Sequence, residues 1–219
     1  MRDLYLSLSF YEIMKFNFII DLDSTNGKLW FSSDFHLGHN NVLKHCCRPY
    51  KTAQENIDDV KDKLKKVLPN DYLILLGDNI WTGQVSRINS FFRGINTRNI
   101  IVFYGNHDRE KNYKDILTDG TILAAERLGH IRVRKEGKEQ EIALCHYPLL
   151  TWNGKARNAW MIHGHCHGNI DKFNNEQPDL RVDVGWDSEL ALYDLVEYSD
   201  LQKFFQEKTK RFSCKSLII

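Results

Sequence analysis

Three short apolar runs occur in the first half of the chain, and polar residues follow each of them at once. The runs are residues 28–32, 72–76 and 99–104. Continuous apolar runs of this length, bounded by turn residues, are typical of buried strands. Between the runs, apolar residues recur at the helical period in 52–68 and 85–92. The pattern therefore predicts strands that alternate with helices in this half of the chain.

The second half carries more strand patterns than helix patterns. A hairpin is predicted around the turn at 136–138, and a final helix over 199–211 with Ser199 and Gln202 as its capping box. The arms of the hairpin are 131–133 and 141–145, and the further predicted strands are the short segments 160–163 and 180–184. Strand–helix alternation followed by a strand-rich half predicts an α/β fold, with a mixed β-sandwich core flanked by helices.

The chain has 219 residues, and no repeat, linker or low-complexity segment divides it. That length fits one medium-sized domain, so 1–219 is interpreted as a single domain. Residues 1–26 precede the first predicted strand and are a candidate N-terminal extension, either an extra helix or strand or a start-site extension. They resemble a signal sequence only briefly, because Glu12 and Lys15 interrupt the apolar pattern.

Charge and cysteine content narrow the class of protein. Thirty Lys and Arg against 29 Asp and Glu leave a net charge of +1, whereas proteins that wrap nucleic-acid backbone usually have a clear basic excess. A local basic groove stays compatible with this balance. No apolar run approaches the roughly 18 residues of a membrane-spanning helix. Five cysteines without CxxC spacing fit reduced thiols, so we expect a cytoplasmic protein with no membrane partner.

Residues with metal-binding chemistry follow the predicted strands. In open α/β sheets ligands bind at the carboxyl ends of strands, so we expect these side chains to converge. They are three oxygen donors and four imidazoles, namely Asp34, Asp78, Asn106, His36, His146, His165 and His167. Seven ligands exceed the need of one divalent cation, but two cations that share a bridging carboxylate use them all. Oxygen and imidazole donors without an obvious thiolate predict Mn, Fe or Zn.

The order of these motifs resembles the calcineurin-like metallophosphoesterase superfamily. D-x-H, G-D, G-N-H-D, H and G-H-x-H follow one another from Asp34 to His167, and the five in order are far more specific than any one alone. The local sequences S-D-F-H-L-G-H-N-N and H-Y-P are similar to a compact single-domain microbial branch. The resemblance implies a four-layer αββα sandwich. Ser33 stands where many members have Gly, and the downstream Asp of some branches is missing after Asn79.

The resemblance also implies a binuclear metal centre. One divalent metal would be held by Asp34, His36 and His167, and the other by Asn106, His146 and His165. Asp78 would bridge the two, and manganese is favoured over iron or zinc. A metal-bridging hydroxide would attack phosphorus, because metal binding lowers the pKa of water to about 7. His107 would face the substrate and protonate the leaving group or stabilise phosphoryl charge, with Asp108 as a second candidate catalytic residue beside it.

Several residues have two interpretations. His39 and Asn41 are candidate substrate contacts, with local stabilisation of the turn as the alternative. Arg48 is a candidate phosphate ligand, because arginine offers phosphate two donors, and its alternative is a surface ion pair. Trp152 and Trp160 could line a base-stacking wall, but aromatic packing in the core is favoured for both.

The sequence thus predicts a metal-dependent phosphoesterase that acts on a phosphodiester or a phosphomonoester, with the diester favoured. Short segments between the motifs leave no room for a cap domain, and the neutral charge favours a substrate the size of a nucleotide or cyclic nucleotide. One alternative is a non-catalytic scaffold on the same fold, against which the complete ligand set argues. The other is a metal-dependent nuclease acting on DNA or RNA, which requires a basic groove beside the metals.

Overall fold

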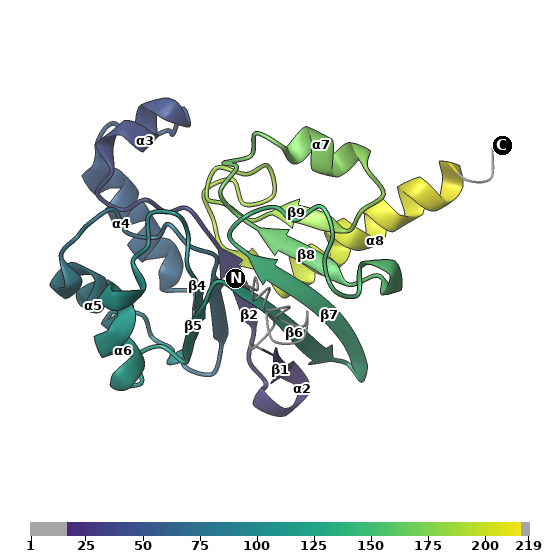
Figure 1. Cartoon of the computed structure of the whole chain (residues 1–219), viewed down its shortest axis with the longest axis horizontal. Helices are drawn as coiled ribbons and strands as arrows, with labels where there is room; N and C mark the ends of the chain where they lie inside the picture. Colours follow the sequence, from purple (N-terminus) through teal and green to yellow (C-terminus); the bar gives the residue numbers. More distant parts are fainter. Residues whose placement is uncertain (1–16, 216–219) are drawn as a thin grey trace, which may run out of the picture.

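The computed structural model describes residues 17–215 and arranges them as two five-stranded sheets with helices outside (Figure 1). One sheet has the strand order β10-β2-β3-β4-β5, and the other β1-β6-β7-β8-β9. Each sheet combines parallel with antiparallel neighbours, because β10 runs against β2 and β6 runs against β7. The predicted α/β sandwich with mixed sheets and flanking helices is confirmed.

The strands are β1 Asn17–Asp21, β2 Leu29–Ser32, β3 Tyr72–Leu75, β4 Asn99–Phe103, β5 Ala124–Glu126, β6 Leu128–Lys135, β7 Lys138–Cys145, β8 Trp160–His163, β9 Arg181–Asp183 and β10 Val196–Glu197. The α-helices are α2 Leu22–Thr25, α3 Asn40–His45, α4 Ala53–Leu64, α5 Val85–Arg93, α6 Lys114–Thr118, α7 Asp171–Glu176 and α8 Tyr198–Lys215. Two short 3₁₀ helices cover Glu110–Tyr113 and Lys155–Arg157.

The three apolar runs of the first half form the parallel strands β2, β3 and β4 at the centre of their sheet. Their alternate side chains serve two cores, as the pleat of a strand requires. Phe31 and Ile74 point into the cluster shared with the other sheet, while Trp30 and Leu73 point into the cluster beneath the helices. Strands buried on both faces explain why these runs show no polar alternation.

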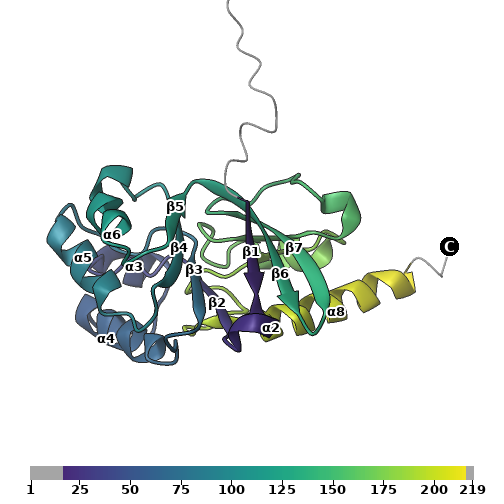
Figure 2. The same ribbon diagram turned by 90° about the horizontal axis from the view of Figure 1, so that it is seen from below.

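Helices α4, α5 and α6 cover the outer face of this sheet (Figure 2). Thr52 caps α4 as predicted, because its Oγ1 accepts the Glu55 N–H at 3.2 Å. The Glu55 carboxylate bonds the N–H of Lys51 at 2.7 Å rather than that of Thr52 itself. The helix ends at Leu64, earlier than the pattern predicts, and the following turn is held by Asp71, whose carboxylate accepts the N–H of Leu68.

The last helix, α8, packs against the core between the two sheets. Its Leu201 and Phe205 belong to the inter-sheet cluster, and the Phe205 ring lies 4.6 Å from that of Trp160. The helix begins at Tyr198, one residue before the predicted start, and Asp200 accepts the N–H of Glu197. The capping box predicted at Ser199 is therefore displaced, since that residue already lies inside the helix.

Part of the candidate N-terminal extension belongs to a sheet. Strand β1 pairs in parallel with β6 over its whole length, and the Ile20 side chain is fully buried. Asp21 caps the short helix α2. The rest of the predicted extension, residues 1–16, lies outside the described residues. Within 17–215, no helix is long and apolar enough to cross a membrane.

The docking of α8 yields a stability prediction. Leu201→Ala should lower the free energy of unfolding by about 2–5 kcal/mol, because it removes a fully buried side chain and leaves a cavity. Leu68→Ala is the matched control, since Leu68 is 58% exposed, and it should cost less than about 0.5 kcal/mol. Urea denaturation measures both values. Equal losses in the two variants would contradict the placement of α8 in the core.

Candidate metal centre

All seven side chains predicted to bind metal follow the carboxyl ends of strands, as the sequence suggested. Asp34 and His36 follow β2, Asp78 follows β3, Asn106 follows β4, His146 follows β7, and His165 and His167 follow β8. Five of them have a left-handed backbone, with φ between 49° and 68°: Asp34, His36, Asp78, His165 and His167. This conformation is costly for residues other than glycine, and such outliers gather at functional sites.

Backbone hydrogen bonds lock the first two ligand loops together. The N–H of Asp34 donates to the carbonyl of Gly77, and the N–H of His36 donates to the carbonyl of Asp78, both at 2.9 Å. Gly77 has φ +95°, and a Cβ there would lie 2.5 Å from the backbone nitrogen of Gly105. The close approach of the β3 and β4 loops therefore requires glycine at this position.

The carboxylate oxygens and imidazole nitrogens converge around Asp34 and Asp78. Asp34 Oδ1 lies 3.7 Å from His36 Nε2 and 3.8 Å from His167 Nε2. Asp78 Oδ2 lies 3.8 Å from His36 Nε2 and 3.5 Å from His146 Nε2. Asp78 thus stands between the two predicted ligand sets, where a bridging carboxylate is expected.

Two buried polar atoms of this cluster show that a cation fits here. Asp34 Oδ1 and His36 Nε2 are buried, and neither has a hydrogen-bond partner in the described part of the chain. Unpaired buried polar atoms are costly, and a cation would satisfy both. Asp34, His36 and His167 have ligand atoms within 4.8 Å of one another, and so do Asp34, Asp78 and His146. The residues present fit a divalent metal centre of oxygen and imidazole donors.

The remaining predicted ligands lie at the open side of the cluster. Asn106 is exposed, and its Oδ1 is 3.1 Å from His146 Nε2. His165 is also exposed, and its ring centroid is 5.0 Å from that of His146. The backbone N–H of His165 donates to Asp34 Oδ2 at 2.8 Å, which links the loop after β8 to the loop after β2.

The buried part of the centre contains two carboxylates, Asp34 and Asp78, whose pKa values are held below the ordinary value. Burial acts to raise the pKa of Asp34, but the neighbouring imidazoles of His36 and His146 more than offset it, so the carboxyl stays ionised. Burial acts to lower the pKa of His146, and the nearby carboxylates of Asp78 and Asp34 raise it instead to about 9. The cluster therefore attracts positive charge, which protons on histidine or metal cations can supply.

His167 is held by a carboxylate that the sequence analysis did not single out. Asp187 accepts a hydrogen bond from His167 Nδ1 at 2.6 Å, which leaves Nε2 to face Asp34. Burial acts to lower the pKa of His167, but the hydrogen bond to Asp187, together with Cys46 and the charge of Asp34, raises it to about 10. Cys46 Sγ lies within 4.8 Å of both groups. A carboxylate on the far nitrogen is the usual device that orients a metal-binding histidine.

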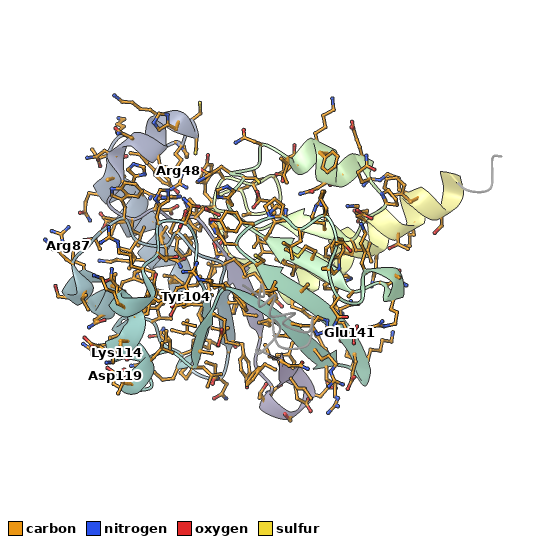
Figure 3. The ribbon with its side chains drawn as sticks, in the orientation of Figure 1. Arg48, Arg87, Tyr104, Lys114, Asp119 and Glu141 are labelled. Atoms are coloured by element: carbon orange, nitrogen blue, oxygen red, sulfur yellow. The ribbon has the colours of Figure 1, made fainter. Side chains whose placement is uncertain are left out.

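Arg48 anchors this pair from inside the protein (Figure 3). Its Nε and Nη2 bond the two carboxylate oxygens of Asp187, both at 2.6 Å. Its Nη1 and Nη2 also donate to the carbonyls of Phe35 and Asp34. Of the two interpretations that the sequence left open for Arg48, the structure shows an ion pair, and it is buried rather than at the surface.

The turn after β4 presents His107 and hides Asp108. The His107 side chain is 40% exposed, and its N–H donates to Asp78 Oδ1 at 2.9 Å. Asp108 accepts the N–H groups of Asp78 and Gly105 and the hydroxyl of Tyr113. These bonds give Asp108 a positioning role in the turn, whereas the sequence analysis offered it as a catalytic residue.

The other candidate contacts separate into two groups. His39 lies beside the centre, with its ring stacked at 3.8 Å on Trp81, a residue that the sequence analysis did not consider. Asn41 is exposed in the first turn of α3.

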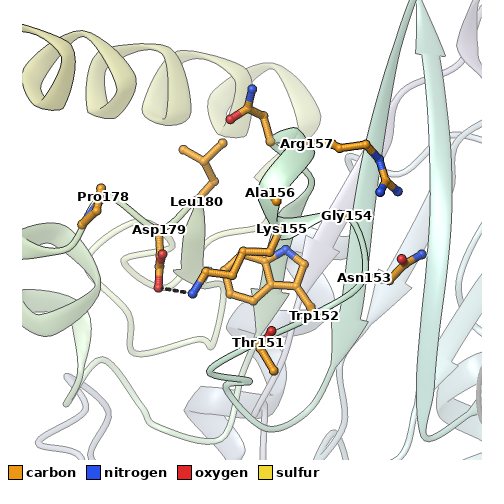
Figure 4. Close-up of a pocket in the computed structure, with 11 residues that line it drawn as sticks. Thr151, Trp152, Asn153, Gly154, Lys155, Ala156, Arg157, Pro178, Asp179 and Leu180 are labelled. Atoms are coloured by element: carbon orange, nitrogen blue, oxygen red, sulfur yellow. Dashed lines mark hydrogen bonds and ion pairs between the residues drawn. The ribbon is translucent and has the colours of Figure 1, made fainter. Parts of the chain in front are cut away.

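Trp152 and Trp160 are buried in core clusters, as favoured. The Trp152 ring is covered by Lys155 Nζ at 4.9 Å, beside a surface pocket where Lys155 pairs with Asp179 (Figure 4).

The missed residues had weak signals in the sequence. Asp187 follows a predicted strand at 180–184, so the strand-end rule that found the other ligands also points to it. Trp81 comes three residues after Asp78, but a single aromatic residue in a loop has no periodicity to distinguish it. Its position became evident only when the loop was placed in space.

The contact between Asp187 and His167 yields a binding prediction. Asp187→Asn should weaken metal binding about 10–100-fold, because it removes the charged acceptor that orients His167. Calorimetric titration of the metal-free protein with Mn²⁺ measures the change. Asp119→Asn is the control, since Asp119 pairs with exposed Arg93 at the surface and should leave the affinity unchanged. Equal affinities in Asp187→Asn and the wild type would contradict the role of Asp187.

Comparisons with known proteins agree with this geometry. A family model described as calcineurin-like phosphoesterase matches residues 27–210. The uncharacterized protein MJ1445 of Methanocaldococcus jannaschii is 25% identical over 163 residues, which cover 72% of this chain and 81% of that protein. The crystal structure of AQ665, a protein of unknown function from Aquifex aeolicus, shares the fold with a TM-score of 0.62 at 21% identity, over 82% of this chain and 100% of that one. The chain therefore belongs to the calcineurin-like phosphoesterase family, and this membership indicates a metal-dependent phosphoester hydrolase.

Proposed function

We propose that this protein hydrolyses a phosphoester of nucleotide size, and a phosphodiester in preference to a monoester, with two divalent metals of which manganese is favoured. The observation that carries the proposal is the pair of buried, unpartnered atoms Asp34 Oδ1 and His36 Nε2, which lie among converging carboxylates and imidazoles. A core with such atoms is stabilised by a cation rather than by packing.

The seven strand-end residues would hold the metals in the two sets expected from the resemblance, with Asp78 between them. When bound, two divalent cations offset the negative charge of a phosphoryl group and lower the pKa of water. The chain contributes orientation, because the loops are fixed by backbone hydrogen bonds and His167 is fixed by Asp187. Ligands held in this way are preorganised for metal binding.

His107 is the candidate for protonating the leaving alkoxide. Its ring is partly exposed at the open side of the centre, and its Nε2 is 3.9 Å from Asp78 Oδ2. The bond from its N–H to Asp78 Oδ1 fixes its backbone beside the ligands. A histidine that can reach solvent and substrate alike can deliver a proton in the step that expels the alcohol.

Substrate size and location belong to the same proposal. The segments that separate the ligand loops form sheets and their covering helices in the described residues, which supports an open centre accessible to a nucleotide or cyclic nucleotide. The free thiols of Cys46, Cys47, Cys145 and Cys166 support a reducing compartment, so we place the protein in the cytoplasm.

An activity assay with defined metals tests the proposal. Protein stripped with a chelator should be inactive, and Mn²⁺ should restore hydrolysis of bis-p-nitrophenyl phosphate more than of p-nitrophenyl phosphate. Inactivity with Mn²⁺, Fe²⁺ and Zn²⁺ alike on these esters and on cyclic nucleotides would favour a non-catalytic scaffold. Cleavage of oligonucleotides, with affinity that falls steeply with salt, would favour a nuclease instead.

The role of His107 gives a separate prediction. His107→Ala should keep its bound metal but lose about 10²–10⁴-fold in turnover of an ester with a poor leaving group, since general acid catalysis contributes about that factor. Elemental analysis of the purified variant reports the metal, and steady-state kinetics report the turnover. His45→Ala, an exposed histidine in α3, is the control and should match the wild type. Undiminished turnover in His107→Ala would refute this role.

A further inference from the structure

Trp81 is an exposed aromatic residue at the rim of the metal centre. Its side chain is 41% exposed, although it lies in a loop with a fixed backbone. The N–H of Trp81 donates to the carbonyl of Leu37 at 3.0 Å, and Leu37 forms a β-bridge with Ile80. The loop that carries Trp81 is therefore tied to the loop that carries Asp34 and His36.

Three histidines in or beside the centre lie near the indole ring. His39 stacks on it with the planes 9° apart, and the ring of His107 lies 4.5 Å from it at an angle of 59°. The His36 ring is 6.3 Å away. Trp81 thus combines a fixed orientation with an exposed area, directly beside the residue that we propose to protonate the leaving group.

A second exposed aromatic residue lies beside two of the candidate ligands. Tyr147 is 42% exposed, and its ring is 5.1 Å from that of His146 and 4.7 Å from that of His165. Single exposed aromatic residues are ordinary on protein surfaces. These two differ because their ring contacts are with histidines in or beside the centre.

Exposed aromatic rings beside a phosphate site have a specific use. Nucleobases stack on indole and phenol rings with little dependence on base identity, because every base presents a π-face. A plain phosphate ester gains nothing from such a surface. Trp152 and Trp160, the candidate base-stacking wall of the sequence, are buried, whereas Trp81 is exposed and adjoins the metal ligands.

We propose that Trp81 is a specificity-determining residue that stacks on the base of a nucleotide substrate. The proposal rests on the phosphoesterase function proposed above and adds the chemical class of the substrate. His39, stacked on the indole, acts as a positioning residue that sets the orientation of the ring. The competing explanation is that Trp81 serves only to hold His107 in place.

Substrate pairs that differ only in the base separate these explanations. The monoester pair is adenosine 5′-monophosphate and 1-O-methylribose 5-phosphate, and the diester pair is adenosine 3′,5′-cyclic phosphate and its 1-O-methylribose counterpart. The quantity to compare is the ratio of kcat/KM for the nucleotide to that for the base-free ester. The wild type should prefer the nucleotide, and Trp81→Leu should lower this ratio about tenfold or more, the factor expected from losing one base–aromatic stack.

Two further variants control the experiment. Trp81→Phe keeps an aromatic ring and should retain the ratio within about threefold of the wild type, since stacking tolerates a smaller ring. Phe173→Leu removes an exposed aromatic residue of α7 that lies over Arg181, and it should leave the ratio unchanged. Circular dichroism and Tm establish that each variant is folded.

Two kinetic outcomes would overturn the proposal. Equal losses on both members of a pair in Trp81→Leu would mean that Trp81 acts only through His107. A wild-type ratio near one would mean that the base is not recognised.

If the wild type hydrolyses neither ester with any metal, the proposed phosphoesterase function fails. Calorimetric binding of the same pairs to the Mn²⁺-loaded protein then tests base stacking by itself. A base-dependent Kd that is lost in Trp81→Leu supports stacking, and equal Kd values for the pair refute it.

Discussion

Two buried carboxylates, Asp34 and Asp78, lie at the ends of neighbouring parallel strands, and the rest of the centre is arranged around their negative charge. Burial acts to raise the pKa of Asp78, and the charge of Asp34 adds to this effect, yet His146 and the N–H of His107 hold the pKa below its ordinary value. Like charges out of water require compensation. Imidazoles supply part of it, and the unpaired atoms Asp34 Oδ1 and His36 Nε2 show where a cation would supply the rest.

Backbone hydrogen bonds, in addition to side-chain contacts, stabilise this arrangement. Left-handed conformations at the ligand positions cost free energy, and hydrogen bonds between loops from different strands offset that cost. The Arg48 guanidinium joins two of these loops, because it bonds both Asp187 and the carbonyl of Asp34. Asp108 does the same on the other side, where it binds the N–H groups of Asp78 and Gly105. The ligands are thus positioned by contacts that do not depend on metal.

The sequence was informative where local pattern and general topology suffice. Apolar runs predicted β2, β3 and β4, and the strand-end rule predicted that residues as distant as Asp34 and His167 would meet. No sequence pattern predicts an interaction that depends on the exact path of the chain. Arg48 and Asp187 are separated by 139 residues, and nothing local shows that this arginine turns inward. Strand β1 stayed one of several alternatives for residues 1–26, because its short apolar run lies at the edge of a sheet and its partner β6 comes more than 100 residues later.

Backbone contacts between two loops would let one loop serve both recognition and chemistry. The bridge between Leu37 and Ile80 fixes Trp81 relative to the Asp34 loop, so the distance from an aromatic platform to the ligands is set by backbone hydrogen bonds. His107 touches that platform and is itself tied to Asp78 through its N–H. A base stacked on Trp81 would therefore be held at a fixed reach from the ligands, and restricting a substrate in this way lowers the entropy cost of reaction. Trp81 and the carboxylates are carried by the same pair of loops. The substrate, the proton donor His107 and the carboxylates would therefore keep fixed positions relative to one another.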